Sequence, residues 1–439
     1  HTWGMNAEYG PRALHGQAWK NWLAEMENEP VPANGDFSNV PRGSKRKWLQ
    51  SYQDHREYAH AAARIVDDGI ATRLGLLAAG VQAPAGSVIV YNPLPWPRSG
   101  MASLNGRLLH AEAVPACGYL TIPAPGDNPA PADPATLDTP FFTVTFDLTR
   151  GGIASMRDKA TGREYVDSSG GHVLGQFLHE RFSTAEVFDR FFSKYSRMQG
   201  GWALNDIGKP GMAGAKDVPY LATTPAAWTS SVLRSSAADQ VVLTSTDPRG
   251  LAKAYRITFT FPRHTPLVDI DWQVDGKTPD KHPEGGWLCF PFAVEHPSFT
   301  VGRPGAPINP ATDIVPGSNR HLMAVATGVT VRGPDGHGAA LCPVDSPLIS
   351  LDHPGLWHWD MDFVPTKPEV FVNLYNNMWN TNFPLWQDGS WSVKVRVWTC
   401  GKDTPPATDL AVHGWEARVP LLAVAATGTK AARLPATRT

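Results

Sequence analysis

The sequence has few cysteines and no long apolar run, and each absence excludes a class of protein. Only 4 of its 439 residues are cysteine, and no two of them form a Cys-x-x-Cys pair. This spacing argues against a thiolate zinc site or a compact disulfide framework and predicts buried free thiols. No apolar run reaches membrane-spanning length, so no membrane partner is expected. The cysteines are Cys117, Cys289, Cys342 and Cys400.

Charge is also scarce and nearly balanced. Charged residues make up 18% of the chain, with 39 basic and 41 acidic side chains. No basic stripe is interleaved with aromatic residues, so nucleic acid is not an expected partner. The residues that are abundant are 16 Trp, 40 Gly and 40 Pro, a composition typical of a turn-rich β-protein with many large aromatic side chains.

The apolar pattern changes from helical to extended along the chain. Residues 44–80 carry apolar side chains at helical spacing, which predicts one long amphipathic helix or two in succession, and residues 13–27 predict a shorter one. After residue 87 the period becomes two, as in 142–148, 255–261 and 391–397. Turn signals such as Arg150-Gly151-Gly152, Asp275-Gly276 and Asp335-Gly336 separate these runs.

These patterns predict a mainly β fold with an N-terminal helical region, in which a large antiparallel β-sandwich follows part of a helical bundle. Six prolines between residues 121 and 140 predict an extended linker or edge connection. The predicted domains are a helical region at 1–82, a small β region with linker at 83–140, a large β-sandwich at 141–426 and a tail at 427–439. The chain begins within what resembles a domain interior, so we expect it to be the C-terminal part of a longer protein.

The sequence contains no complete active site. It lacks a Gly-x-Ser-x-Gly elbow, a phosphate loop and a dinucleotide fingerprint. Glycoside hydrolysis needs two carboxyl groups facing each other across the bond to be cleaved. Sequence spacing does not select such a pair, because every candidate lies in a segment that also suits a turn or a salt-bridged strand. These candidates are Glu164, Glu180, Asp189, Asp206 and Asp313.

A histidine and aspartate group occurs at residues 353–362. If His358-Trp359-Asp360-Met361-Asp362 were extended, His358, Asp360 and Asp362 would lie on one face, near His353. That arrangement suits a divalent cation or paired carboxylates, but no fourth ligand is marked. The alternative is a solvated strand face beside a Pro-Gly turn.

The stretch YNNMWNTNFPLW, residues 375–386, combines four aromatic residues with four asparagines. Aromatic faces stack on the apolar side of a sugar ring, and Asn amides hydrogen-bond to its hydroxyls. The alternative is a bulky strand end packed under a loop, with Asn serving turns. As candidate sugar-binding residues we name Trp379, Asn380, Asn382 and Trp386.

Several segments, in order, resemble the C-terminal half of glycoside hydrolase family 38, the zinc-dependent retaining α-mannosidases. They are VIVYNPLPWPRSG (88–100), FFTVTFDLTRGGIASMRDKATGREYVD (141–167), GQFLHERFS (175–183) and the stretch 375–386. The resemblance runs from the opening HTWG to about Leu421, and the 141–167 segment is its most specific part.

The resemblance implies a galactose-mutarotase-like supersandwich and a mannoside-like substrate. It also implies zinc, held in an N-terminal catalytic domain of the same protein together with the nucleophile. His1, directly before the helical region, is the residue that the resemblance carries over as the last zinc ligand. Many family members have His-His-Asp at this point, whereas Thr2 and Trp3 follow here.

The leading hypothesis is therefore the middle helices and β-domains of an α-mannosidase-like hydrolase, in which the β-domains brace the catalytic domain and contribute to the sugar-binding rim. The chain alone is expected to lack the nucleophile and to be inactive. One alternative is a non-catalytic carbohydrate-binding or structural β-sandwich. Another is a polysaccharide lyase, which would need a Tyr or His base beside an Arg or Asn that neutralises a uronate.

Overall fold

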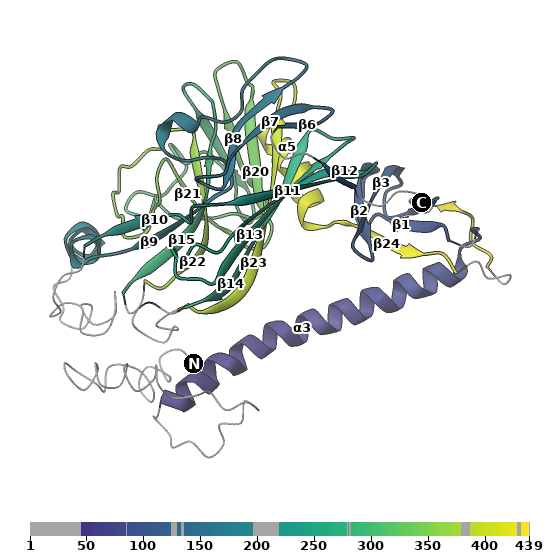
Figure 1. Cartoon of the computed structure of the whole chain (residues 1–439), viewed down its shortest axis with the longest axis horizontal. Helices are drawn as coiled ribbons and strands as arrows, with labels where there is room; N and C mark the ends of the chain where they lie inside the picture. Colours follow the sequence, from purple (N-terminus) through teal and green to yellow (C-terminus); the bar gives the residue numbers. More distant parts are fainter. Residues whose placement is uncertain are drawn as a thin grey trace.

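The computed structural model describes residues 45–84, 86–123, 130–132, 136–195, 219–278, 280, 282–378, 387–427 and 432–438. For residues 45–53 and 130–132 it describes the backbone alone. Strand is the commonest regular structure in the described chain, and one long helix precedes the strands (Figure 1), so the predicted mainly β fold with an N-terminal helical region is confirmed.

The body is a β-sandwich of two large antiparallel sheets (Figure 1). In order, the six-stranded sheet contains β10 (Leu221–Thr223), β9 (Gln176–Arg181), β15 (Glu284–Pro291), β22 (Glu369–Asn376), β21 (Leu348–Leu351) and β18 (Met323–Ala324). The ten-stranded sheet contains β17 (Pro307–Ile308), β16 (Ser298–Gly302), β19 (Gly328–Arg332), β20 (Gly338–Pro343), β23 (Gly389–Cys400), β14 (Leu267–Lys277), β13 (Ala254–Pro262), β12 (Ala238–Ser245), β11 (Thr229–Arg234) and β5 (Ala130–Ala132).

The main hydrophobic core lies between these sheets, because alternate residues of each strand point inward. Phe177 of the six-stranded sheet packs on Trp272 of the ten-stranded sheet, with ring centroids 5.1 Å apart. The predicted hairpin at 141–167 closes one side of this core as β7 (Phe142–Asp147) and β8 (Gly152–Asp158), with β6 (Leu137–Asp138) beside them. Phe146 of β7 packs on Phe259, with centroids 5.4 Å apart.

A second apolar cluster covers the opposite face of the six-stranded sheet. It includes Trp287, Phe371 and Trp357 together with residues of the π-helix Ala185–Phe192. There are also two short helical segments. Ser168–Gly170 lies between β8 and β9, and α4 (Ser193–Tyr195) directly follows the π-helix. Helix α5 (Pro406–Arg418) packs against β16, β19 and β20, where Arg332 pairs with the buried Asp409 at 2.6 Å.

A smaller six-stranded sheet combines strands that follow helix α3 with strands from the C-terminal end of the described chain. Its order is β25 (Thr437–Arg438), β4 (Tyr119–Ile122), β1 (Val88–Tyr91), β24 (Leu421–Ala425), β2 (Arg98–Leu104) and β3 (Arg107–Val114). The strands after residue 420 therefore pair with the small β region and not with the sandwich. The predicted division at residue 426 does not match this pairing, and the predicted tail contains the paired strand β25.

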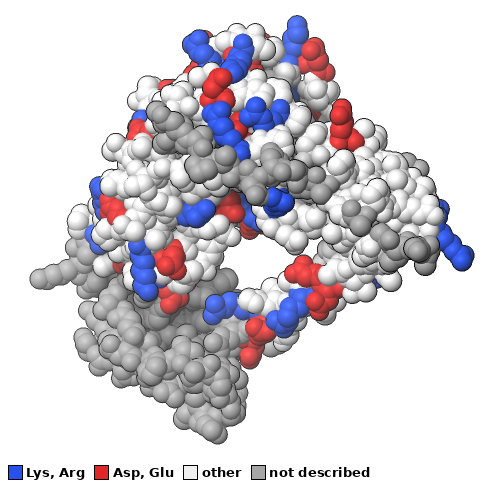
Figure 2. All heavy atoms as spheres, turned by 45° about the vertical axis from the view of Figure 1, so that its right-hand side comes forward, with Lys and Arg blue, Asp and Glu red and all other residues white. Residues whose placement is uncertain are grey.

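Helix α3 (Lys45–Gly80) is a single helix of 36 residues, so of the two arrangements predicted for 44–80 the continuous one is observed. At 1.5 Å per residue it is about 54 Å long. Its end packs on the small sheet through Ala78. Figure 2 shows the rest of the helix bearing charges of both signs, with an open space between it and the sandwich.

Other local predictions have mixed outcomes. The strands predicted from 142–148, 255–261 and 391–397 are β7, β13 and β23, and β5 forms an edge strand in the proline-rich connection, as expected. Asp275-Gly276 is wrong as a turn, because β14 continues through it with a shift of register at a bulge. All four cysteines are free, but Cys117 is exposed, which contradicts its predicted burial. Among the described helices, none is long and apolar enough to cross a membrane.

Candidate functional site

The predicted sugar-binding stretch begins at the end of β22, and β23 of the ten-stranded sheet begins shortly after it in sequence. Its first four residues, 375–378, are described: Asn376 is exposed, and Tyr375, Asn377 and Met378 are buried. The four candidate sugar-binding residues, Trp379, Asn380, Asn382 and Trp386, lie outside the described residues, and so does His1.

A buried ion pair joins the two sheets next to Asn377. Lys277, at the end of β14, places its Nζ 2.8 and 2.9 Å from the two carboxylate oxygens of Glu284, at the start of β15. The two side chains are 1% and 0% exposed. Because an unpaired charge at this depth is strongly disfavoured, the pair fixes the separation of the strand ends.

Asn377 within the stretch and Gln387 directly after it are both bonded to this pair. Asn377 Oδ1 accepts a hydrogen bond from the Glu284 amide at 2.7 Å. Lys277 Nζ donates to the Gln387 carbonyl at 3.0 Å. Asn377 and Gln387, on either side of residues 379–386 in the sequence, are therefore both held at the same buried pair.

His179 and Tyr375 complete the polar cluster. His179 Nδ1 lies 2.9 Å from the Tyr375 hydroxyl, and the Lys277 ammonium lies 5.1 Å from the centroid of the Tyr375 ring. Burial, helped by the nearby Lys277 charge, lowers the pKa of His179 to about 4. Burial also raises the pKa of Tyr375 well above its usual value. Both side chains are therefore neutral at pH 7.

Glu180 points to the other face of the same sheet. It accepts hydrogen bonds from the Tyr220 hydroxyl at 2.6 Å and from Trp287 Nε1 at 2.7 Å, and burial raises its pKa. Glu164 is bonded within the hairpin, where it accepts from Ser155 and from backbone amides. Glu164 and Glu180 are thus each bonded to separate partners and not to each other.

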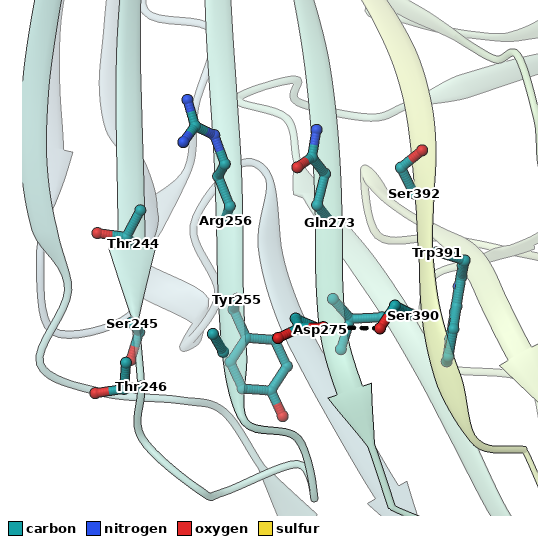
Figure 3. A pocket seen from close by; sticks show the side chains of 12 residues that line it. Thr244, Ser245, Thr246, Tyr255, Arg256, Gln273, Asp275, Ser390, Trp391 and Ser392 are labelled. Carbon is teal, nitrogen blue, oxygen red and sulfur yellow. Dashed lines mark hydrogen bonds between the residues drawn. The ribbon is translucent and has the colours of Figure 1, made fainter.

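A shallow groove of about 550 Å³ lies across four strands of the ten-stranded sheet (Figure 3). Arg256 on β13 is paired in register with Thr244 on β12 and with Gln273 on β14, and Gln273 is paired with Ser392 on β23. Figure 3 shows Arg256 and Gln273 extending to the same side of the sheet. This row supplies hydroxyl, amide and guanidinium groups, which together can bind a polyhydroxylated or anionic ligand.

Two groups of described residues have the composition of a metal site. The first, His179, Asp280 and Glu284, does not fit a divalent ion, because the Lys277 ammonium already occupies the carboxylate of Glu284. The second, His321, His353 and His358, lies at the opposite edge of the six-stranded sheet, beside β18 and β21. The segment 357–362 is a loop and not the strand assumed for the predicted cation site. The group combines His358 and His353 with His321, and it contains neither Asp360 nor Asp362.

Sequence reasoning missed the cluster of Lys277, Glu284, His179 and Gln387. Each member lies on a different segment, and the Asp275-Gly276 dipeptide suggested that the strand stops before Lys277. The nearest signal was His179 and Glu180 within the segment GQFLHERFS, which was singled out for its resemblance alone.

No family model matches the sequence, and no curated protein matches it. Among solved structures, an α-mannosidase from Enterococcus faecalis V583 is similar to it, with a TM-score of 0.50 and 10% identity over 81% of this chain and 42% of that chain. A glycosyl hydrolase family 38 protein from Enterococcus faecalis has a TM-score of 0.48 and 9% identity, covering 81% and 43% of the two chains. A galactose mutarotase-like protein from Lactobacillus casei covers 62% of this chain and 100% of its own, at 14% identity and a TM-score of 0.33.

This chain thus spans less than half the length of the mannosidase that it resembles. At 10% identity the likeness is one of fold. The resemblance to family 38 drawn from the sequence is confirmed at that level: the chain has the fold of part of an α-mannosidase.

Proposed function

We propose that this chain is the C-terminal part of a retaining, zinc-dependent, α-mannosidase-like glycoside hydrolase. Its β-sandwich would brace the N-terminal catalytic domain and contribute residues 375–386 to the rim of the sugar site. The observation that carries the proposal is the double anchoring of that stretch to the Lys277–Glu284 pair, in a chain with the fold of part of an α-mannosidase.

The anchoring matters because a sugar-binding loop loses conformational entropy when it orders. Bonds from the buried pair to Asn377 and Gln387 hold both ends of the stretch before any ligand arrives. Stacking by Trp379 and Trp386, with hydrogen bonds from Asn380 and Asn382, would then supply affinity and orientation.

An interface between this chain and a catalytic domain is supported by helix α3. Several of its apolar side chains are exposed, including Tyr58 and Ile65 at 75% and Leu76 at 70%. Exposed apolar surface of this kind is typical of a protein interaction site. The proposed occupant is the catalytic domain of the same protein, which would hold the nucleophile and, with His1, the zinc that binds the sugar hydroxyls.

A non-catalytic carbohydrate-binding module is the second candidate, and the groove at Arg256 and Gln273 favours it. A lyase has weaker support. His179, Tyr375 and Asn377 do lie in one cluster, but each is buried, and the nearby Lys277 is committed to Glu284.

The direct test is hydrolysis of an aryl α-mannoside by the 439-residue chain with added zinc. We expect no turnover, because the nucleophile is proposed to lie in the catalytic domain. Measurable turnover abolished by a substitution within this chain would show that the active site lies here.

The rim is tested separately, by calorimetric titration with an α-mannoside oligosaccharide. Trp379→Ala and Trp386→Ala are each expected to weaken binding about 5–10-fold, the equivalent of about 1–1.4 kcal/mol of lost stacking. Trp415, on α5 and 46% exposed, is the matched control. If Arg256→Ala abolishes binding while Trp379→Ala and Trp386→Ala do not, the groove is the sugar site and the rim proposal is wrong.

A further inference from the structure

Three histidines converge at the β18 edge of the six-stranded sheet. His321, His353 and His358 each offer a ring nitrogen, and these atoms lie within 4.8 Å of one another. The ring centroids are 5.3 Å apart for His321 and His353, 5.2 Å for His321 and His358, and 4.6 Å for His353 and His358. The ligand atoms of a tetrahedral zinc ion lie about 3.4 Å apart, so a movement of roughly 1 Å by each ring would bring the three nitrogens to that spacing.

The backbone is shaped to bring the rings together. His321 precedes β18 and His353 follows β21, and these strands are antiparallel neighbours. Gly355 lets the connecting loop approach closely, because a Cβ there would lie 2.3 Å from the His321 carbonyl oxygen. Asp352 and Trp357, directly before His353 and His358, have φ of 73° and 59°. Non-glycine residues rarely adopt this conformation, which costs about 1–3 kcal/mol each and is concentrated at functional sites.

The histidines carry buried nitrogen atoms that lack partners. His321 is 1% exposed, and its Nδ1 has no hydrogen-bond partner within the described chain. The same holds for the buried Nε2 of His353. A buried polar atom without a partner costs about 1–3 kcal/mol, so two of them on residues of one cluster require an explanation.

The opposite nitrogens are close to carboxylates. His353 Nδ1 lies 3.4 Å from Asp352 Oδ1, and His321 Nε2 lies 3.3 Å from Asp360 Oδ2. A metal-binding histidine commonly donates its other N–H to a carboxylate in this way, which sets the tautomer and orients the ring. In the alternative tautomer, His321 Nε2 accepts the Asp360 amide at 3.1 Å, and a buried Nδ1–H is left without an acceptor.

Burial and two nearby carboxylates determine the electrostatics of the three histidines. Burial, reinforced by the neighbouring His353, lowers the pKa of His321 to about 4. Burial also lowers the pKa of His358 to about 3, with the Arg190 charge contributing. Asp352 and Asp360 would offset a divalent charge, although Lys194 also pairs with Asp360.

We propose that His321, His353 and His358 bind one divalent transition-metal ion of the zinc class, through His321 Nδ1, His353 Nε2 and one ring nitrogen of His358. Three imidazoles leave the fourth position of a tetrahedral ion open to water or another ligand. The site belongs to the β-sandwich itself, and its ligands all lie between residues 321 and 358. It does not depend on the proposed glycosidase function.

The test is metal binding by the metal-stripped 439-residue chain, measured by zinc titration calorimetry and by the visible absorption of added cobalt(II). Wild type is expected to bind one more equivalent of zinc than His321→Ala or His353→Ala, and to show a tetrahedral cobalt band that both variants lack. His60→Ala, an exposed histidine on α3, is the matched control and should behave as wild type.

Asp352→Asn keeps all three imidazoles and tolerates the positive φ. It is expected to retain the stoichiometry while weakening zinc binding about 10–100-fold. This variant and the wild-type cobalt spectrum remain informative even if a histidine variant fails to fold. A wild-type chain without a tetrahedral cobalt band, or an equal zinc stoichiometry in wild type and both alanine variants, would overturn the proposal.

Discussion

Breaking the buried Lys277–Glu284 pair should cost far more stability than breaking an exposed pair of similar length. In a Lys277→Met variant, Glu284 would remain fully buried and lose an ammonium at 2.8 and 2.9 Å, and the Gln387 carbonyl would lose its donor. Removing one partner of a buried pair costs about 3–5 kcal/mol, because the remaining charge is left uncompensated. We expect the free energy of unfolding to fall by that amount.

The assay is urea denaturation followed by tryptophan fluorescence at pH 7. The double variant Lys277→Met/Glu284→Gln removes both charges, so it should recover most of the loss. Arg163→Met is the control: Arg163 and Asp335 are 2.6 Å apart but 36% and 49% exposed, so its cost should stay below about 1 kcal/mol. If Lys277→Met costs no more than Arg163→Met, the pair does not hold the strand ends as argued.

Three further predictions concern stability. Asn92→Ala should cost about 2–4 kcal/mol in urea denaturation, because the fully buried amide donates to the Trp96 and Pro115 carbonyls and accepts from Arg98 Nε; a cost under 1 kcal/mol would contradict this role. Gly151→Ala should lower the thermal midpoint, because Gly151 has φ of 74° and a Cβ would lie 2.2 Å from the Trp228 ring; an unchanged midpoint would count against that close approach. The folded-state pKa of His179, about 4, is below its ordinary 6.5, so the unfolded chain binds more protons between these values and stability falls as pH drops through them. Wild type should therefore lose about 3 kcal/mol more than His179→Gln between pH 7 and pH 4, measured as the difference in free energy of unfolding, and parallel curves would refute the shift.

Local patterns predicted the parts of the fold in which neighbours in sequence are neighbours in space. Alternation identified β7, β13 and β23, and the hairpin at 141–167 carries its own turn signals. The pairing of β1 with β24 could not be predicted this way, because the two strands lie at opposite ends of the described chain and both are short apolar runs. Asp275-Gly276 is a second example, because the same dipeptide suits a turn between strands and a bulge within one strand.

In the candidate sites, some residues stand out in the sequence, whereas others are brought to them only by the fold. The aromatic and amide residues of 375–386 stand out in the sequence, but the ion pair that anchors them joins Lys277 to Glu284 across two sheets. His353 and His358 are visible as a local pair, whereas His321 reaches them only because β18 and β21 are adjacent. Single-sequence spacing does not contain that adjacency.

The small sheet has a consequence for how the protein is made. Its central strand β1 is synthesised before the sandwich, but its partner β24 follows the last strand of the sandwich in sequence. At about 5–20 residues per second, β1 must wait for tens of seconds with one edge unpaired, while the sandwich can already form. The small sheet therefore completes its strand pairing after the sandwich has formed. Deleting the residues after 420 would remove β24 from this sheet and leave the sandwich core intact.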